Sequence, residues 1–179
     1  AVTVDSASLP DGHLNFQVRS NLATEIRDRQ FVVANGAKPA GNWPDAILEF
    51  SVGARISNAK IKKTPTGSVQ VLFNEEVVGS IPANTRKEYS FPINASQLHA
   101  ANTLSFKFSD PADGMTLGSP VLKIGKNQLR DPRDTAVRKI KAAHWGTGAV
   151  DWGGYLVGDS PELVGNPFQR KQSRFCFVL

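Results

Sequence analysis

Residues 67–106 alternate apolar and polar side chains, and this alternation constrains the fold more than any other feature of the chain. Three runs carry the pattern most clearly, and they cover residues 69–73, 88–93 and 103–108. Because successive side chains of an extended strand point to opposite faces, a period of two places every second residue in a core. Short polar breaks separate the runs, as they do between antiparallel strands. The stretch therefore predicts antiparallel strands with one buried face.

Other runs with strand character lie on both sides of this stretch. They cover residues 13–18, 30–34, 46–52, 56–61 and 120–124. Together these give about eight strands at intervals of roughly 8–12 residues, a spacing typical of sandwiches and barrels. Strands do not alternate with helical segments, which argues against a parallel α/β sheet. We therefore predict an all-β fold, specifically an antiparallel jelly-roll β-sandwich.

The character of the sequence changes after Lys126. Asp131 followed by Pro132 is typical of the start of a helix, with the aspartate as its cap. Apolar residues at helical spacing continue to about His144 and predict one short helix. A segment rich in glycine and turn residues follows, and residues 174–179 form a further candidate strand. We expect this part of the chain to be partly irregular.

These observations predict two regions in a chain of 179 residues, of which 40% are hydrophobic. Residues 1–126 are expected to form the β-sandwich domain. Residues 127–179 are expected to form a C-terminal extension that packs on the sandwich. The extension is too short to build a stable core without a metal or a disulfide. The single cysteine, Cys176, cannot form a disulfide within the chain.

Composition makes some partners less expected than others. No segment approaches the ~20 consecutive apolar residues of a membrane-spanning helix, so we expect no membrane span. The formal net charge of +5 is mildly basic. A nucleic-acid surface needs converging basic clusters, whereas acidic residues such as Asp131 and Asp134 are interleaved here. We therefore interpret the basic clusters as solvated surface charge, and we do not expect a nucleic-acid partner.

The central stretch resembles the galactose-binding-like jelly rolls that occur as accessory domains in many secreted carbohydrate-active enzymes. The likeness covers roughly residues 46–124 and consists of strand faces and turns rather than a catalytic motif. The matching residues are Val69, Val71, Asn74, Val78, Gly79, Tyr89, Phe91, Ile93, Leu98, Asn102, Thr103, Leu104 and Phe106.

This resemblance implies a jelly-roll fold and a carbohydrate or glycan as partner. It also implies that the chain is part of a larger polypeptide that is secreted or periplasmic. The first residues, Ala1 to Thr3, fit the end left by signal-peptide removal, although an artificial boundary fits equally well. Because fold alone does not determine function, the binding residues must be sought separately.

One glycine-rich segment holds the densest group of candidate ligand-binding residues. It contains Trp145, Trp152 and Tyr155, with His144 and Asp151 among them. Sugar rings stack on exposed aromatic faces, and the imidazole and the carboxylate can hydrogen-bond to hydroxyls. The alternative is that the tryptophans anchor the extension on the sandwich, where each buried ring contributes roughly 1.5–3 kcal/mol. Both interpretations stay open at this point.

Trp43 is a further candidate ligand-binding aromatic. It lies in a loop between Asn42 and Pro44. A loop tryptophan can present its ring to a sugar, and it can equally plug the open end of a sandwich.

Signals for catalysis or metal binding are weak. The three histidines show no metal-ligand spacing, so we expect no cofactor, although a structural calcium ion held by loop oxygens is possible. Cys176 lies between two phenylalanines, which predicts a buried, inert thiol. Glu75 and Glu76 are expected to form a solvated turn. Among the strand-associated carboxylates Glu49, Glu75, Glu76 and Glu88, no pair suggests glycoside chemistry.

The sequence therefore favours a non-catalytic carbohydrate-binding or accessory domain of a secreted protein. Two alternatives remain. The first is a structural or assembly jelly roll, such as a capsid or appendage subunit, in which the extension contacts a neighbour. The second is a small hydrolase or lyase that acts on polysaccharides, and we expect an enzyme less than a binding domain.

Overall fold

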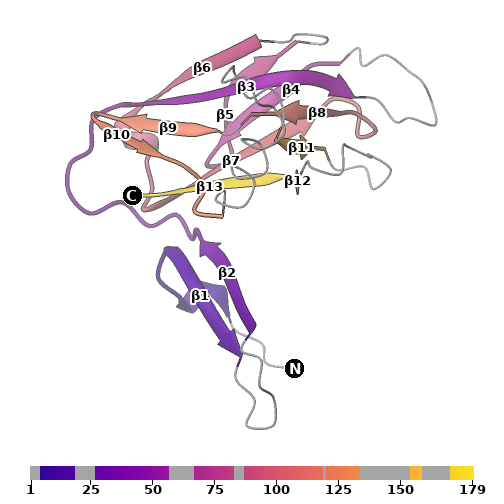
Figure 1. Ribbon diagram of the computed structural model, residues 1–179. Helices are drawn as coiled ribbons and strands as arrows, with labels where there is room; N and C mark the ends of the chain where they lie inside the picture. Colours follow the sequence, from indigo (N-terminus) through magenta and orange to yellow (C-terminus); the bar gives the residue numbers. More distant parts are fainter. Residues whose placement is uncertain are drawn as a thin grey trace.

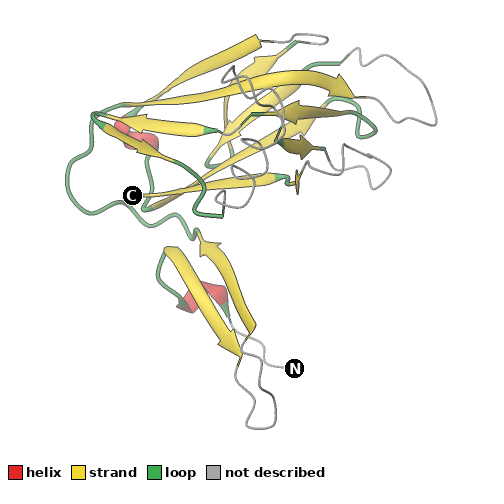
Figure 2. Ribbon diagram, in the orientation of Figure 1, coloured by secondary structure: helices red, strands yellow, loops and turns green. Residues whose placement is uncertain are grey.

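Nearly every element of the protein is a β-strand, as the computed structural model shows in Figures 1 and 2. The helical elements in the described parts are two short 3-10 turns, η1 (Ser6–Ser8) and η2 (Ala95–Gln97). The predicted all-β class is therefore confirmed. The structure describes residues 5–18, 27–56, 67–82, 87–118, 120–133, 154–158 and 170–179.

The larger sheet is built around β3 (Ala46–Ile56), the longest described strand. One edge of β3 pairs with β6 (Lys87–Ile93), and the other pairs with β9 (Val121–Ile124) and then β8 (Gly114–Leu117). All three pairings are antiparallel. Further strands extend the sheet, and they are β10 (Asn127–Leu129), β11 (Tyr155–Val157) and β12 (Arg170–Lys171).

The smaller sheet faces the larger one and has four antiparallel strands in the order β13–β7–β4–β5. Their bounds are β4 (Val69–Phe73), β5 (Glu76–Ile81), β7 (Ala101–Phe108) and β13 (Arg174–Val178). The chain crosses between the sheets from β3 to β4, from β5 to β6, from β6 to β7 and from β7 to β8. Such crossings make two facing sheets from one chain, as in a β-sandwich.

The core confirms the period-two prediction. Val69, Val71 and Phe73 of β4 are fully buried, while Gln70 between them is exposed. Aromatic rings from both sheets meet in the same core, because Phe50 of β3 packs edge-on against Phe106 of β7 with ring centroids 5.4 Å apart. Edge-to-face contacts of this kind stabilise the core beyond the effect of burying the rings.

Several strands escaped prediction, and burial explains why β8 and β11 did. All four residues of β8 and all three of β11 are buried, so neither strand shows the alternation that marks a half-exposed strand. β10 is exposed at Asn127 and Gln128 and has too few apolar residues to be recognised. Glycine-rich sequence around β11 had suggested an irregular segment instead.

The chain after Lys126 supplies strands to both sheets. β11 joins the larger sheet through β8, and β13 pairs with β7 in the smaller sheet. The final strand expected over residues 174–179 is therefore confirmed. Most of the expected helix and most of the strand expected over residues 56–61 fall outside the described ranges, so both stay predictions.

The hairpin of β1 (Gly12–Val18) and β2 (Arg27–Val33) lies apart from both sheets, as Figure 1 shows. Its base is tied to the link that leads to β3. The two oxygens of the Asp11 carboxylate accept hydrogen bonds from the amides of Asn35 at 2.7 Å and Ala37 at 2.9 Å. The carbonyl of Ala37 accepts one from the amide of Ala100 at 2.8 Å. The base of the hairpin is thus connected to the loop before β7.

Gly79 of β5 lies close to Phe91 of β6, a strand of the larger sheet. A Cβ atom at Gly79 would lie 2.2 Å from Cε1 of Phe91. The Phe91 ring is held between Phe50 and Tyr89, with ring centroids at 5.7 and 6.1 Å, so it cannot move without breaking these contacts. Glycine is therefore required here by space.

We expect Gly79→Ala to lower the free energy of unfolding by about 1–3 kcal/mol, the usual cost of overpacking a core. Urea unfolding followed by circular dichroism measures the change. Ser80→Ala on the same strand is the control, because the Ser80 side chain is exposed and its loss should cost less than about 0.5 kcal/mol. Equal unfolding midpoints for the two variants would contradict the proposed packing.

Candidate functional site

A polar cleft opens on the face of the smaller sheet that points away from the core. It has a volume of about 210 Å³. Four separate parts of the chain line it, so it exists only in the folded protein. They are the link after β2 (Ala34, Asn35 and Gly36), the β4–β5 turn (Asn74 and Glu75), the start of β7 and the loop before it (His99, Ala101 and Thr103), and β13 (Arg174).

The β4–β5 turn places Glu75 at the cleft in a strained conformation. Phe73 pairs with Glu76, so Asn74 and Glu75 form a two-residue hairpin loop. Their φ angles are 49° and 69°, as the favoured hairpin turn requires. Asparagine adopts this left-handed conformation readily, and glycine is preferred at the second position. Glutamate at the second position costs about 1 kcal/mol.

A network of side-chain amides, Asn74 partly buried and Asn102 fully buried, holds the floor of the cleft. The Asn74 side chain donates to Oδ1 of Asn102 at 3.0 Å and to the carbonyl of Gln97 at 2.8 Å. Its own oxygen accepts from the amide of Thr103 at 2.8 Å. The fully buried Asn102 also bonds to both the amide and the carbonyl of His99, at 2.9 and 2.7 Å. The backbone beneath the cleft is therefore fixed before any ligand arrives.

Four side chains at the cleft have unengaged polar groups. In the part of the chain that the structure describes, Glu75, His99, Thr103 and Arg174 make no side-chain hydrogen bond or ion pair. Neighbouring side chains are engaged, since Glu76, for example, accepts a hydrogen bond from Nε2 of Gln97 at 2.9 Å. A carboxylate, an imidazole, a hydroxyl and a guanidinium are thus available to a ligand.

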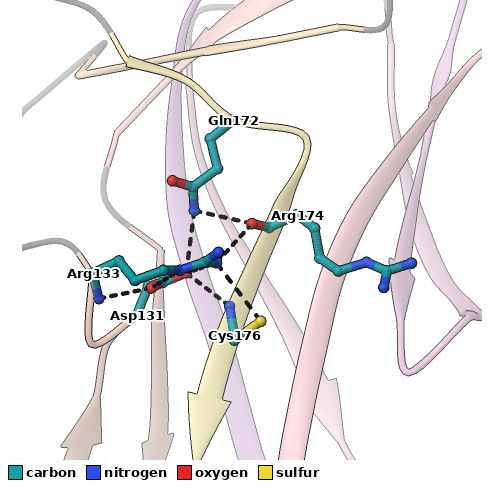
Figure 3. Close-up of polar contacts among 5 residues, drawn as sticks. All are labelled: Asp131, Arg133, Gln172, Arg174 and Cys176. Atoms are coloured by element: carbon teal, nitrogen blue, oxygen red, sulfur yellow. Dashed lines mark hydrogen bonds and ion pairs between the residues drawn. The ribbon is translucent and has the colours of Figure 1, made fainter. Parts of the chain in front are cut away.

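Near the backbone of Arg174, the buried carboxylate of Asp131 accepts a hydrogen bond from the edge of β13, as Figure 3 shows. Asp131 is 4% exposed and accepts five hydrogen bonds. Three come from the amide, Nε and Nη2 of Arg133, at 2.9, 2.8 and 2.6 Å. The others come from Nε2 of Gln172 at 3.1 Å and the amide of Cys176 at 3.0 Å. This group is called the Asp131 cluster below.

The Asp131 cluster satisfies backbone groups that an edge strand leaves unpaired. Among the described residues, β13 is the last strand of the smaller sheet, so the amide of Cys176 and the carbonyl of Arg174 have no partner strand there. The amide of Cys176 donates to Asp131, and the carbonyl of Arg174 accepts from Gln172 and Arg133 at 3.0 and 3.2 Å. The edge is thereby protected from pairing with another chain. The Arg174 side chain points away from the cluster (Figure 3).

Burial and hydrogen bonding act in opposite directions on the Asp131 carboxyl. Burial raises its pKa, but the hydrogen bonds and charge of Arg133 and the amide of Cys176 outweigh burial and hold the pKa below the usual 3.8. The hydrogen bond to Asp131 likewise raises the pKa of Arg133. Burial raises the pKa of the Cys176 thiol, which is therefore neutral. The predicted burial of the Cys176 thiol is confirmed.

The Asp131 cluster corrects one interpretation of the sequence. The charge pattern of the sequence places Asp131 among solvated surface charges, yet the Asp131 carboxyl is buried and paired with Arg133. Pairing with a residue two positions away and with residues 41 and 45 positions away is invisible in a charge pattern. The bond from the amide of Arg133 to Asp131 is also the bond that a helix cap makes, so the predicted helix start remains compatible.

The structure describes two of the predicted ligand-binding residues. Tyr155 is 1% exposed, and its ring packs edge-on against Phe175 with centroids 4.8 Å apart. A ligand has no access to a ring in that position. Trp43 is partly buried against the core, and its indole N–H donates to the carbonyl of Ala40 at 3.0 Å. The other four, His144, Trp145, Asp151 and Trp152, lie outside the described residues.

The cleft itself was not predicted. Its four available side chains come from residues 75, 99, 103 and 174, and no spacing in the sequence connects them. The resemblance pattern did include Asn74, Asn102 and Thr103, and these residues build the floor of the cleft. Glu75 and Glu76 are both exposed, as the predicted solvated turn requires. The turn itself consists of Asn74 and Glu75, and Glu76 is the first residue of β5.

Metal and membrane sites can be assessed only within the described ranges. There, no group of three His, Cys, Asp or Glu side chains is placed to hold a metal ion. The structural calcium ion stays a prediction. No helix in the same ranges is long and apolar enough to cross a membrane. Glu49 is engaged in an ion pair with Lys123 at 2.6 Å across β3 and β9.

The described part of the protein thus has a mostly antiparallel all-β fold of the β-sandwich type, with a polar cleft on the smaller sheet. No model of a known family and no curated protein matches the sequence, and no solved structure matches the coordinates.

We expect Asp131→Asn to lower the free energy of unfolding at pH 7 by about 3 kcal/mol, because it leaves the charge of Arg133 partly buried and unpaired. The pKa of Asp131 is lower in the folded state than its unfolded value of about 3.9, so its contribution is present above that pH. This contribution to stability disappears as the pH falls further. The difference in the free energy of unfolding between wild type and variant should therefore narrow toward pH 2.

Urea unfolding at pH 7, 4 and 2.5 tests this prediction. Glu88→Gln is the matched control, because the Glu88 side chain is exposed on β6 and forms no ion pair or hydrogen bond among the described residues. A gap between wild type and Asp131→Asn that is independent of pH would contradict the role of this carboxylate.

Proposed function

We propose that this chain is a non-catalytic carbohydrate-binding domain, an accessory part of a larger secreted or periplasmic protein. The observation that supports the proposal is the convergence of four unengaged polar side chains, Glu75, His99, Thr103 and Arg174, on one cleft. A sugar presents several hydroxyls that both donate and accept hydrogen bonds. The four groups supply acceptors and donors for them on a backbone that is already fixed.

The size of the cleft favours a single sugar unit. Its volume of about 210 Å³ is below the roughly 300–1,000 Å³ of sites for drug-sized ligands. An open surface cleft of this size suits one residue of a polysaccharide or the end of a glycan. Affinity is then expected to be modest, because few groups take part.

Binding is favoured over hydrolysis by the carboxylates of the cleft. Glu75 is the one carboxylate that lines the cleft among the residues described. Most glycoside hydrolases use two carboxylates on opposite sides of the bond that they cleave. Glu75 also occupies a strained backbone conformation, and such strain is concentrated at functional sites. We therefore assign Glu75 to the binding of sugar hydroxyls.

We expect Glu75→Gly to separate stability from binding. Glycine relieves the strained turn, so the melting temperature should stay equal or rise, with a gain of up to about 1 kcal/mol. Loss of the carboxylate should weaken glycan binding about tenfold, which corresponds to about 1.4 kcal/mol. A glycan array identifies the best ligand, and calorimetry with that ligand compares binding by Glu75→Gly and wild type. Thermal melting compares their stability.

Trp152→Ala is a further arm of this experiment, since the aromatic residues outside the described ranges remain candidates for stacking on the sugar. Binding weakened by Trp152→Ala and unchanged by Glu75→Gly would move the site away from the cleft. Failure of wild type to bind any glycan on the array would refute the proposed function.

A second function, assembly with other subunits, is favoured by the position of the β1–β2 hairpin. The hairpin stands apart from both sheets (Figure 1). A two-stranded hairpin is marginally stable in water unless another surface covers it. In an appendage or capsid, a neighbouring subunit supplies that surface.

Light scattering after size-exclusion chromatography tests the assembly proposal. If neighbouring subunits cover the hairpin, the intact protein should have a multiple of the 19.4 kDa chain mass, and deletion of residues 1–33 should give a monomer. A monomeric intact protein at all concentrations would rule out self-assembly. Glycan binding by that monomer would favour the first proposal.

A further inference from the structure

We propose that the cleft selects acidic sugars and holds the carboxylate of a uronic acid residue through Arg174. This inference rests on the proposed function, since it specifies the ligand of the same cleft. Arg174 makes no side-chain ion pair or hydrogen bond within the described parts, and its side chain lines the cleft. The guanidinium group matches a carboxylate with two parallel hydrogen bonds, a geometry that lysine cannot offer.

The positive charge of Arg174 is available because the nearest buried carboxylate is already neutralised. Asp131 pairs with Arg133 at 2.6 Å and uses its remaining capacity on Gln172 and Cys176. The cluster therefore holds the backbone of Arg174 without competing for its guanidinium. A neutral sugar would leave this charge without a counter-charge, whereas a uronate supplies one.

The backbone at Arg174 is fixed in advance. Its carbonyl accepts two hydrogen bonds, from Gln172 and Arg133, and the next residue, Phe175, is fully buried in the core. Only the side-chain torsions of Arg174 remain to be ordered when a ligand binds. A preorganised backbone reduces the entropic cost of forming the ion pair.

Glu75 limits which anions fit. It lines the same cleft from the β4–β5 turn and forms no ion pair with Arg174. A ligand that is anionic on every side is repelled by Glu75, as inorganic phosphate would be. A uronic acid carries a single carboxylate, and its other polar groups are neutral hydroxyls. It therefore offers a carboxylate to Arg174 and hydroxyl donors to Glu75. The formal net charge of +5 adds long-range attraction to acidic polysaccharides.

The experiment compares each acidic oligosaccharide with its own methyl ester, which keeps the sugar and removes the charge. The panel contains oligomers of galacturonic, glucuronic and mannuronic acid, together with neutral galactan and glucan. We expect wild type to bind at least one acid about tenfold more tightly than its ester, at 0.15 M salt. Arg174→Gln should abolish this preference, and Lys126→Gln, which removes one exposed charge on the β9–β10 turn, should retain it.

The outcomes separate this inference from the proposed function. Equal binding of acids and esters, or tighter binding of neutral glycans, overturns the inference and leaves the carbohydrate-binding proposal standing. Binding of no glycan overturns both. Equal weakening by Arg174→Gln and Lys126→Gln shows attraction to a basic surface in general and also overturns the inference. Thermal melting of both variants checks that each is folded.

Discussion

The hydrogen bond from the amide of Cys176 to the buried carboxylate of Asp131 joins the last strand to the segment that follows β10. Without this carboxylate, β13 would present an open edge with two unpaired backbone groups. Because β13 also places Phe175 and Phe177 in the core, its position determines one side of the sandwich. A single buried acid thus connects the edge of the smaller sheet, the packing of the core and the wall of the cleft.

Alternation along β13 explains how one strand serves both core and cleft. Phe175 and Phe177 point inward, and Arg174 and Cys176 point to the opposite face. Cys176 is covered by Arg133, whereas the Arg174 side chain extends away from that cover (Figure 3). Arg174 is one of the residues that line the cleft. The strand therefore cannot shift by one residue without exchanging two phenylalanines for a guanidinium in the core. The same register that stabilises the sandwich presents Arg174 to the outside.

The sequence predicted strands correctly where one face is exposed to solvent and the other is buried. β4, with its buried Val69, Val71 and Phe73, is an example. The sequence was uninformative where both faces are covered, as in β8 and β11, since alternation then disappears. The cleft could not be foreseen, because Glu75 and Arg174 meet only through the pairing of β4 with β7 and of β7 with β13. The burial of Asp131 was not predicted, because two of its partners, Gln172 and Cys176, lie far along the chain.

The polar residues of this sandwich fall into two groups according to whether their hydrogen-bonding capacity is used. The polar groups of Asp131, Asn74 and Asn102 form hydrogen bonds within the fold, so these side chains stabilise the structure. Glu75 and Arg174 have unused capacity, and Glu75 occupies a backbone conformation that glycine would adopt at less cost. Folding alone gives no reason for an unpaired glutamate at that position. A ligand that donates a hydroxyl hydrogen bond to Glu75 and pairs its carboxylate with Arg174, as proposed above, supplies such a reason.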